Sequence, residues 1–92
     1  MKIEFSPDIQ ADLKAGTISQ DELYAYFCRE HHHDWGDVDE FQSKENEEAI
    51  RTRTVGTLSM YRANNGKALY FVTRFNKAGE QDAGIFMYVT EY

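Results

Sequence analysis

Several features that would identify a protein class are missing from this sequence. A single cysteine, Cys28, excludes a disulfide within the chain. A protein without internal disulfides suits a reducing compartment. No apolar run approaches the roughly 18–20 residues of a membrane span. Residues 1–9 also lack the sustained apolar core of a signal peptide. These absences predict a soluble, cytoplasmic protein that does not contact membranes.

Recognisable catalytic and ligand-binding motifs are absent as well. Gly56, Gly66, Gly79 and Gly84 are scattered, so no glycine-rich loop is available to hold a phosphate. There is no CxxC or HExxH motif for a metal. The net charge of −6 argues against direct binding to nucleic acid, which needs a basic surface. We therefore expect a non-enzymatic protein with no cofactor and no nucleic-acid ligand.

The charge that is present is unevenly distributed. Residues 1–50 have a balance of −9, whereas residues 51–92 have a balance of +3. Residues 34–48 hold seven carboxylates and one lysine. A chain polarised in this way has a preferred face for an oppositely charged partner. The candidate partner-binding residues are Asp34, Trp35, Asp37, Asp39, Glu40, Glu45, Glu47 and Glu48.

Each part of this segment has a structural interpretation as well as a functional one. An exposed Trp35 would anchor a partner, but the same residue could cover the edge of the core where a helix meets the sheet. The carboxylates could form an acidic recognition face, or only helix caps and solvated loop charges. His31, His32, His33 and Asp34 are metal-ligand types. Consecutive residues at a helix end point about 100° apart, however, so we expect no bound metal and interpret the histidines as complements to the helix dipole.

The first half of the chain reads as helical. Ser6 is an expected N-cap with Pro7 at the first helical position, and Gly16 is expected to end that helix. Ser19 to Glu22 form a capping box before a second helix at about residues 20–32. The short connection between them predicts a helical hairpin. A third, mostly solvated helix is expected over residues 43–52.

From residue 54 the apolar period changes to two, which is typical of strands. Strands are expected over residues 54–61, 69–75 and 83–90, with a type I′ turn at Asn65-Gly66 and a second turn at residues 76–79. Residues 2–5 could extend briefly. The predicted fold is one α+β domain: an N-terminal helical hairpin plus a short acidic helix, then a three-stranded antiparallel β-meander. The later strands are apolar on both faces, so one face is free for a partner or a second copy.

A set of short motifs is similar to a known family. The motifs are Arg29 and His31, Asp34-Trp35-Gly36-Asp37, Asn46, Leu58-Ser59-Met60-Tyr61, Val72-Thr73 and the final Glu91-Tyr92. This pattern resembles the small bacterial proteins of plasmids and integrative elements that are described only as plasmid-related or uncharacterised. The resemblance covers roughly residues 8–92, and its most specific part is DWGD. His33 stands where that pattern has glycine, and residues 74–76 replace an acidic, arginine-containing turn.

The resemblance implies a mobile-element origin but transfers no activity. Small acidic proteins from such elements often inhibit host defence enzymes by direct binding. We therefore expect a protein that binds and inhibits a bacterial nucleic-acid-processing defence complex, through contact with a basic protein or a nucleic-acid-binding complex of the host. One alternative is a homodimeric accessory or regulatory protein of plasmid maintenance without an inhibitory role. A further alternative is a small metal-dependent enzyme that uses His31, His33 and Asp34.

Overall fold

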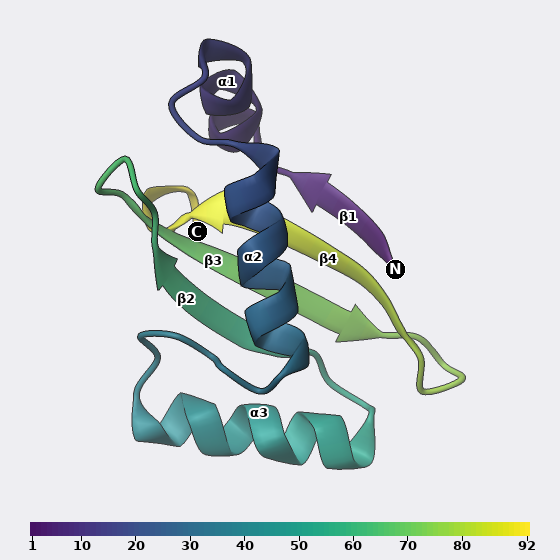
Figure 1. The fold of residues 1–92 in the computed structure, drawn as a ribbon. Helices are drawn as coiled ribbons and strands as arrows, with labels where there is room; N and C mark the ends of the chain where they lie inside the picture. The colour runs from purple at the N-terminus through teal and green to yellow at the C-terminus, as the bar shows by residue number, and fades with distance from the viewer.

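The computed structural model describes residues 1–92, which form one sheet with helices on one of its faces and at its margins (Figure 1). In chain order the elements are β1 (Lys2–Phe5), α1 (Pro7–Ala15), α2 (Gln20–His31), α3 (Glu40–Thr52), β2 (Leu58–Arg62), β3 (Ala68–Phe75), β4 (Gln81–Tyr88) and the 3-10 helix η1 (Val89–Glu91). None of the helices is long and apolar enough to cross a membrane.

The starts of the first two helices follow the expected capping residues. The Ser6 hydroxyl accepts a hydrogen bond from the Ile9 amide, Pro7 is the first helical residue, and Gly16 ends α1 with a φ of 80°. The Ser19 hydroxyl accepts from the Glu22 amide at the start of α2. The Glu22 carboxylate does not complete the expected capping box, because it binds the Asn64 amide instead. Local side-chain chemistry therefore determined where these helices begin.

The third helix begins earlier than expected. The Asp39 carboxylate accepts from the Gln42 amide at 2.8 Å, so Asp39 is the N-cap and α3 begins at Glu40 rather than at residue 43. A carboxylate is favoured at this position because it binds a free amide and faces the positive end of the helix dipole.

The predicted three-stranded antiparallel meander after a helical hairpin is wrong. The sheet has four strands in the order β1-β4-β3-β2, and β1 is parallel to β4, from Lys2 opposite Ala83 to Phe5 opposite Phe86. α1 packs against β4 instead of pairing with α2. The cause is the four-residue β1, which joins the opposite end of the chain and thereby places α1 beside the sheet.

The two hairpins within the sheet form where turns were expected, but with a different geometry. Gly66 has a φ of 86° while Asn65 is not left-handed, which excludes a type I′ turn. The Gly66 amide donates to the Ala63 carbonyl at 2.9 Å, and the Gly79 amide donates to Asn76 in the same way at 3.0 Å. Both connections are therefore longer loops that end in a left-handed glycine.

The core lies between α1, α2 and one face of the sheet. Alternate strand residues point toward α2, which crosses the sheet in Figure 1. The buried hydrophobic cluster consists of Ile9, Ile18, Leu23, Tyr26, Tyr61, Ala63, Leu69, Phe71, Phe86 and Tyr88. Burial of these side chains provides most of the driving force for folding.

The opposite sheet face has no helix packed on it. In the central part of this face the strand residues are half-buried and apolar, whereas Lys2, Glu4, Arg62 and Arg74 lie exposed at its margins. We call this surface the open face, and its central residues are Leu58, Met60, Tyr70, Val72, Ala83, Ile85 and Met87. An apolar surface of this kind is a feature of interaction sites.

Candidate functional site at the edge of the open face

The most specific motif of the sequence, DWGD, covers the free edge of β2. The Met60 amide donates to the Trp35 carbonyl at 3.1 Å, and the Asp37 amide donates to the Met60 carbonyl at 2.7 Å. Gly36 lies between them with a φ of 72°, and a Cβ there would stand 2.0 Å from the Met60 carbonyl oxygen. The glycine is therefore required by the close approach of two backbones.

Asn46 completes the cover of this edge. Its side chain is fully buried, with Nδ2 donating to the Leu58 carbonyl at 2.9 Å and Oδ1 accepting from the Leu58 amide at 3.0 Å. One amide side chain thus replaces the hydrogen bonds of a missing neighbouring strand, so the edge cannot pair with another chain. Asn46 also attaches α3 to the sheet. Sequence reasoning noted this residue only as part of a resemblance. The available signal was its position on the same helix face as Ala49 and Ile50, the apolar residues of this stretch.

Trp35 is a core residue in this structure. It is 4% exposed, its indole Nε1–H donates to Glu47 at 3.0 Å, and the His33 ring stacks on it at 5.2 Å. The burial favours the interpretation that Trp35 covers the edge of the core, because it leaves little indole surface to anchor a partner. Glu47 binds both the Trp35 indole and His33 Nδ1, the latter at 2.9 Å.

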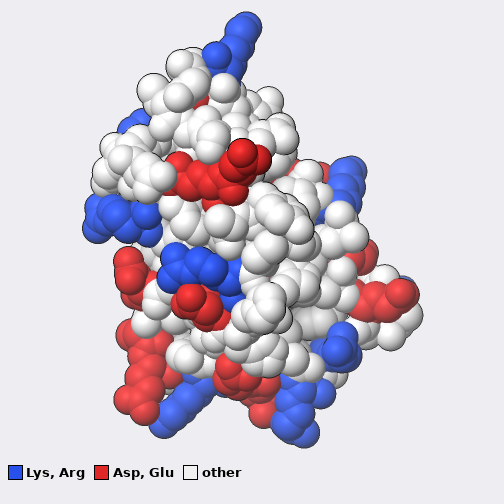
Figure 2. Space-filling view, in the orientation of Figure 1, with Lys and Arg blue, Asp and Glu red and all other residues white.

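Three further carboxylates of the acidic segment pair with basic side chains of the same molecule. Asp34 accepts from Arg29 at 2.8 Å, and this hydrogen bond lowers the pKa of Asp34. The hydrogen bond from Arg51 lowers the pKa of Glu48 in the same way. Glu40 lies 3.3 Å from Lys44, one turn along α3. In Figure 2 the acidic and basic side chains alternate around the end of the molecule that contains α3.

The remaining carboxylates of the segment are not neutralised. Asp37 and Glu45 have no basic side chain within ion-pair distance, and Asp39 makes its contact with the helix amide of Gln42. Asp37 and Asp39 lie together where the chain passes from the β2 edge into α3. The tertiary structure therefore reduces a segment of seven carboxylates to a small unpaired group beside the open face.

This group borders a hollow of about 350 Å³ that we call the edge hollow. It is lined by Asp37, Val38, Asp39, Phe41, Gln42, Leu58, Met60 and Tyr70. The last three sit on β2 and β3 and belong to the open face. Phe41 is 72% exposed, which is unusual for a side chain of its size. The edge hollow thus combines an apolar floor, an exposed aromatic ring and two carboxylates.

The three histidines do not converge. The Nδ1 atoms of His31, His32 and His33 lie at hydrogen-bond distance from three different acceptors: the Phe27 carbonyl, the Cys28 carbonyl and Glu47. No group of three or more His, Cys, Asp or Glu side chains is arranged to hold a metal ion. The arrangement gives no geometric basis for the metal-dependent alternative.

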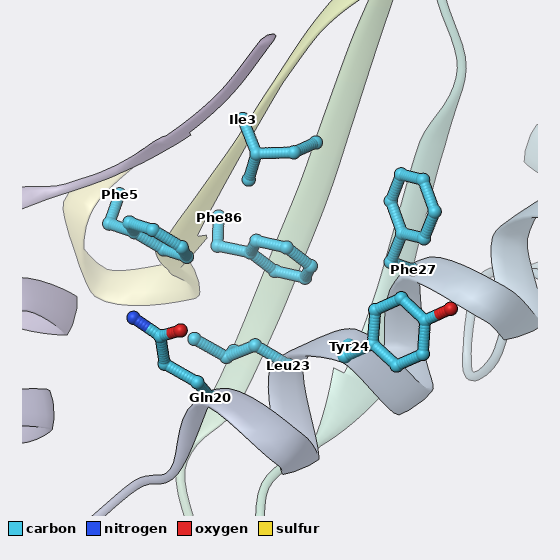
Figure 3. A pocket seen from close by; sticks show the side chains of 7 residues that line it. All are labelled: Ile3, Phe5, Gln20, Leu23, Tyr24, Phe27 and Phe86. Carbon is cyan, nitrogen blue, oxygen red and sulfur yellow. The ribbon is translucent and has the colours of Figure 1, made fainter. Parts of the chain in front are cut away.

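A second hollow, of about 270 Å³, lies between β1 and α2 (Figure 3). Ile3 and Phe5 from β1 face Leu23 and Phe27 from α2 across it, and Gln20 is its one polar lining residue. A specific ligand site needs several convergent polar groups in addition to apolar walls. This hollow offers apolar contact without a chemical indication of what would fill it.

Comparisons with protein-family models, with curated proteins and with solved structures gave no match for this chain.

Proposed function

We propose that this chain acts by binding another protein, and that the edge hollow is its binding site. The observation that carries the proposal is the position of Asp37 and Asp39, two carboxylates without basic partners, on the rim of an exposed apolar hollow. At the same rim Phe41 is 72% exposed, which is unusual for an apolar side chain of its size.

The chemistry of the hollow supports one kind of partner. Its floor of Leu58, Met60 and Tyr70 suits an apolar or aromatic side chain, and Phe41 can close over it from the side. The rim carboxylates favour lysine or arginine next to that side chain. Asp39 can contact a cation while it caps α3, because the capping hydrogen bond uses one carboxylate oxygen. The partner is therefore a basic protein that presents an apolar side chain flanked by positive charge.

The identity of that partner rests on the sequence resemblance alone. If the chain comes from a mobile element, a nucleic-acid-processing defence complex of the host is the basic partner that fits, and binding would inhibit it. The homodimeric alternative is favoured by a different observation, the apolar open face beyond the edge hollow. In a dimer this face would be buried against a second copy.

The test is affinity capture from a bacterial lysate, followed by cross-linking of each captured protein to locate its contact. If the partner binds at the edge hollow, the double variant Asp37→Asn with Phe41→Ala should abolish capture. Glu45 is also an exposed carboxylate without a basic partner, so Glu45→Gln is the control and should leave capture unchanged. Association should also slow as ionic strength rises, because the Debye length falls to about 8 Å at 0.15 M salt. A partner that binds the double variant normally, or a stable dimer in sedimentation measurements that buries the open face, would refute the proposal.

A further inference from the structure

The outer edge of β1 is the one sheet edge that the fold leaves uncovered. The other edge, β2, is covered by the backbone at Trp35 and Asp37 and by the Asn46 side chain. β1 lies at the opposite end of the strand order and pairs only with β4, and no other element lies beyond it in Figure 1. An uncovered edge is a template for pairing with another strand.

The contact with β4 determines which backbone groups of β1 face outward. The Ser6 amide donates to the Phe86 carbonyl at 2.9 Å, so the even-numbered residues of this strand direct their backbone groups toward β4. Ile3 and Phe5 therefore direct theirs outward. The Phe5 carbonyl accepts from Gln10 Nε2 at 2.7 Å, which agrees with this direction and occupies that acceptor. The amide and carbonyl of Ile3 and the amide of Phe5 are left at the uncovered edge.

We propose that this edge pairs with a second copy of the same chain, antiparallel and with Ile3 opposite Ile3. The two copies would be related by a two-fold axis, the commonest symmetry of protein dimers. Each Ile3 amide would donate to the Ile3 carbonyl of the other copy, because two outward-facing residues that oppose each other exchange both hydrogen bonds. The two sheets would then form one continuous sheet with both copies of β1 at its centre.

The charges of β1 select this register. Outward-facing residues must oppose each other, so Ile3 can stand opposite only Met1, Ile3 or Phe5 of the second copy. Opposite Met1, two Lys2 side chains would face each other, and opposite Phe5, two Glu4 side chains would. Only the register with Ile3 opposite Ile3 places each Lys2 opposite Glu4 of the second copy. Opposite charges across an antiparallel pair are favourable, whereas like charges are unfavourable.

Both charged side chains are available for this contact. Lys2 and Glu4 are exposed, and Lys2 Nζ lies 3.6 Å from Glu4 Oε1 of the same chain. An ion pair this exposed contributes little to the fold. In the proposed register Lys2 and Glu4 occupy a non-hydrogen-bonded position, where opposed side chains come closest. Each charge would therefore gain a second partner of opposite sign.

The apolar side of β1 is also complementary to itself in this register. Ile3 and Phe5 point toward α2 and line the hollow of about 270 Å³ between β1 and α2 (Figure 3). Ile3 of the second copy would lie on the same face, with its Cβ about 5 Å from that of Ile3, and would extend the apolar wall of this hollow. Tyr24 lines the same hollow and is 65% exposed. A second copy would thus cover an apolar region that the single chain leaves open.

The first test follows sedimentation and amide hydrogen exchange as the chain concentration rises from about 10 µM to about 1 mM, a range suited to a small interface. We expect a monomer–dimer equilibrium in which protection of the Ile3 and Phe5 amides increases with concentration. The Glu4 amide faces β4 and should be protected throughout, so it is the internal control. A chain that stays monomeric over this range, or a dimer protected at the open face or at β2, would overturn the proposal.

Charge variants test the register itself. Lys2→Glu and Glu4→Lys each place like charges opposite each other and should weaken dimerisation by about tenfold or more. Both positions are exposed, so the fold should survive. The double variant Lys2→Glu with Glu4→Lys should dimerise as the unmodified chain does, and a mixture of the two single variants should form a heterodimer. Lys44→Glu, at an exposed position of α3, is the matched control and should leave dimerisation unchanged.

The outcomes separate this proposal from the proposed function. β1 and β2 lie at opposite ends of the sheet, so the edge-hollow double variant Asp37→Asn with Phe41→Ala should dimerise normally. Single charge variants that dimerise as the unmodified chain does, or a mixture that gives no heterodimer, would contradict the β1 register. Protection of Ile3 only after a different protein is added would show that the edge accepts a strand of another protein, and would exclude the second copy as its partner.

Discussion

Replacing Asn46 by alanine should strongly destabilise this protein, because Asn46 is the hydrogen-bonding partner of a sheet edge. The change removes the bonds of 2.9 and 3.0 Å to the Leu58 carbonyl and amide and leaves both groups in a partly buried position. A buried polar group without a partner costs about 1–3 kcal/mol. Two groups near the lower end of that range, plus a small cavity, give a loss of about 3 kcal/mol.

That loss is a large fraction of the total free energy of unfolding. A chain of 92 residues is expected to have an unfolding free energy of about 5–14 kcal/mol. Urea unfolding, followed by the fluorescence of Trp35, measures the difference. Asn64→Ala is the matched control, since that side chain is exposed and the change should stay within about 0.5 kcal/mol.

A second variant distinguishes lost hydrogen bonds from lost volume. Asn46→Asp has almost the same size but places a carboxylate oxygen against the Leu58 carbonyl, so it should also cost more than about 1 kcal/mol. Both variants should aggregate more readily, because the β2 edge becomes available to another chain. A loss below about 0.5 kcal/mol for Asn46→Ala, or a fully stable Asn46→Asp, would refute the edge-cover argument.

Four other results are expected. Gly36→Ala should cost several kcal/mol in urea unfolding, since its Cβ would overlap the Met60 carbonyl at a left-handed φ; a neutral effect would contradict the edge contact. Trp35→Ala should lower the unfolding free energy by about 3–5 kcal/mol, as expected for a buried tryptophan; a stable variant with weakened partner binding would instead make Trp35 an anchor. The Asp34 pKa is lowered by its hydrogen bond from Arg29, so Asp34 stabilises the fold above about pH 4 and this contribution disappears as the pH falls further; Asp34→Asn should therefore lose less stability on acidification than the unmodified chain. Burial raises the pKa of Tyr61 to about 12, so stability should fall as the pH rises from about 10 toward 12, and Tyr61→Phe should reduce that fall in ultraviolet-monitored titrations.

The limits of α1 and the positions of the two turns are properties of short stretches of this sequence. Ser6, Pro7 and Gly16 determine α1 through a hydroxyl, a fixed φ and a left-handed residue, all within one or two turns of chain. Gly66 and Gly79 place the hairpins for the same reason. Because each of these devices acts on its immediate neighbours, sequence reasoning located them correctly.

The placement of distant segments was decided only by the tertiary structure. β1 has four residues and weak alternation, and nothing in it indicates a parallel partner at the far end of the chain. The acidic segment is one charged run in the sequence, yet folding brings Arg29 and His33 onto its carboxylates and leaves Asp37 beside the open face.

The same division applies to the edge hollow and to the buried carboxylate of Glu30. Sequence reasoning identified the rim carboxylates of the edge hollow but had no means of placing Leu58, Met60 and Tyr70 beneath them. It included Glu30 only as part of a helical repeat, although the fold buries this carboxylate among Thr57, Thr73 and Gln81. The physical reason is that residue type and spacing determine backbone conformation locally, whereas burial and electrostatic environment depend on which remote segments return to the same place.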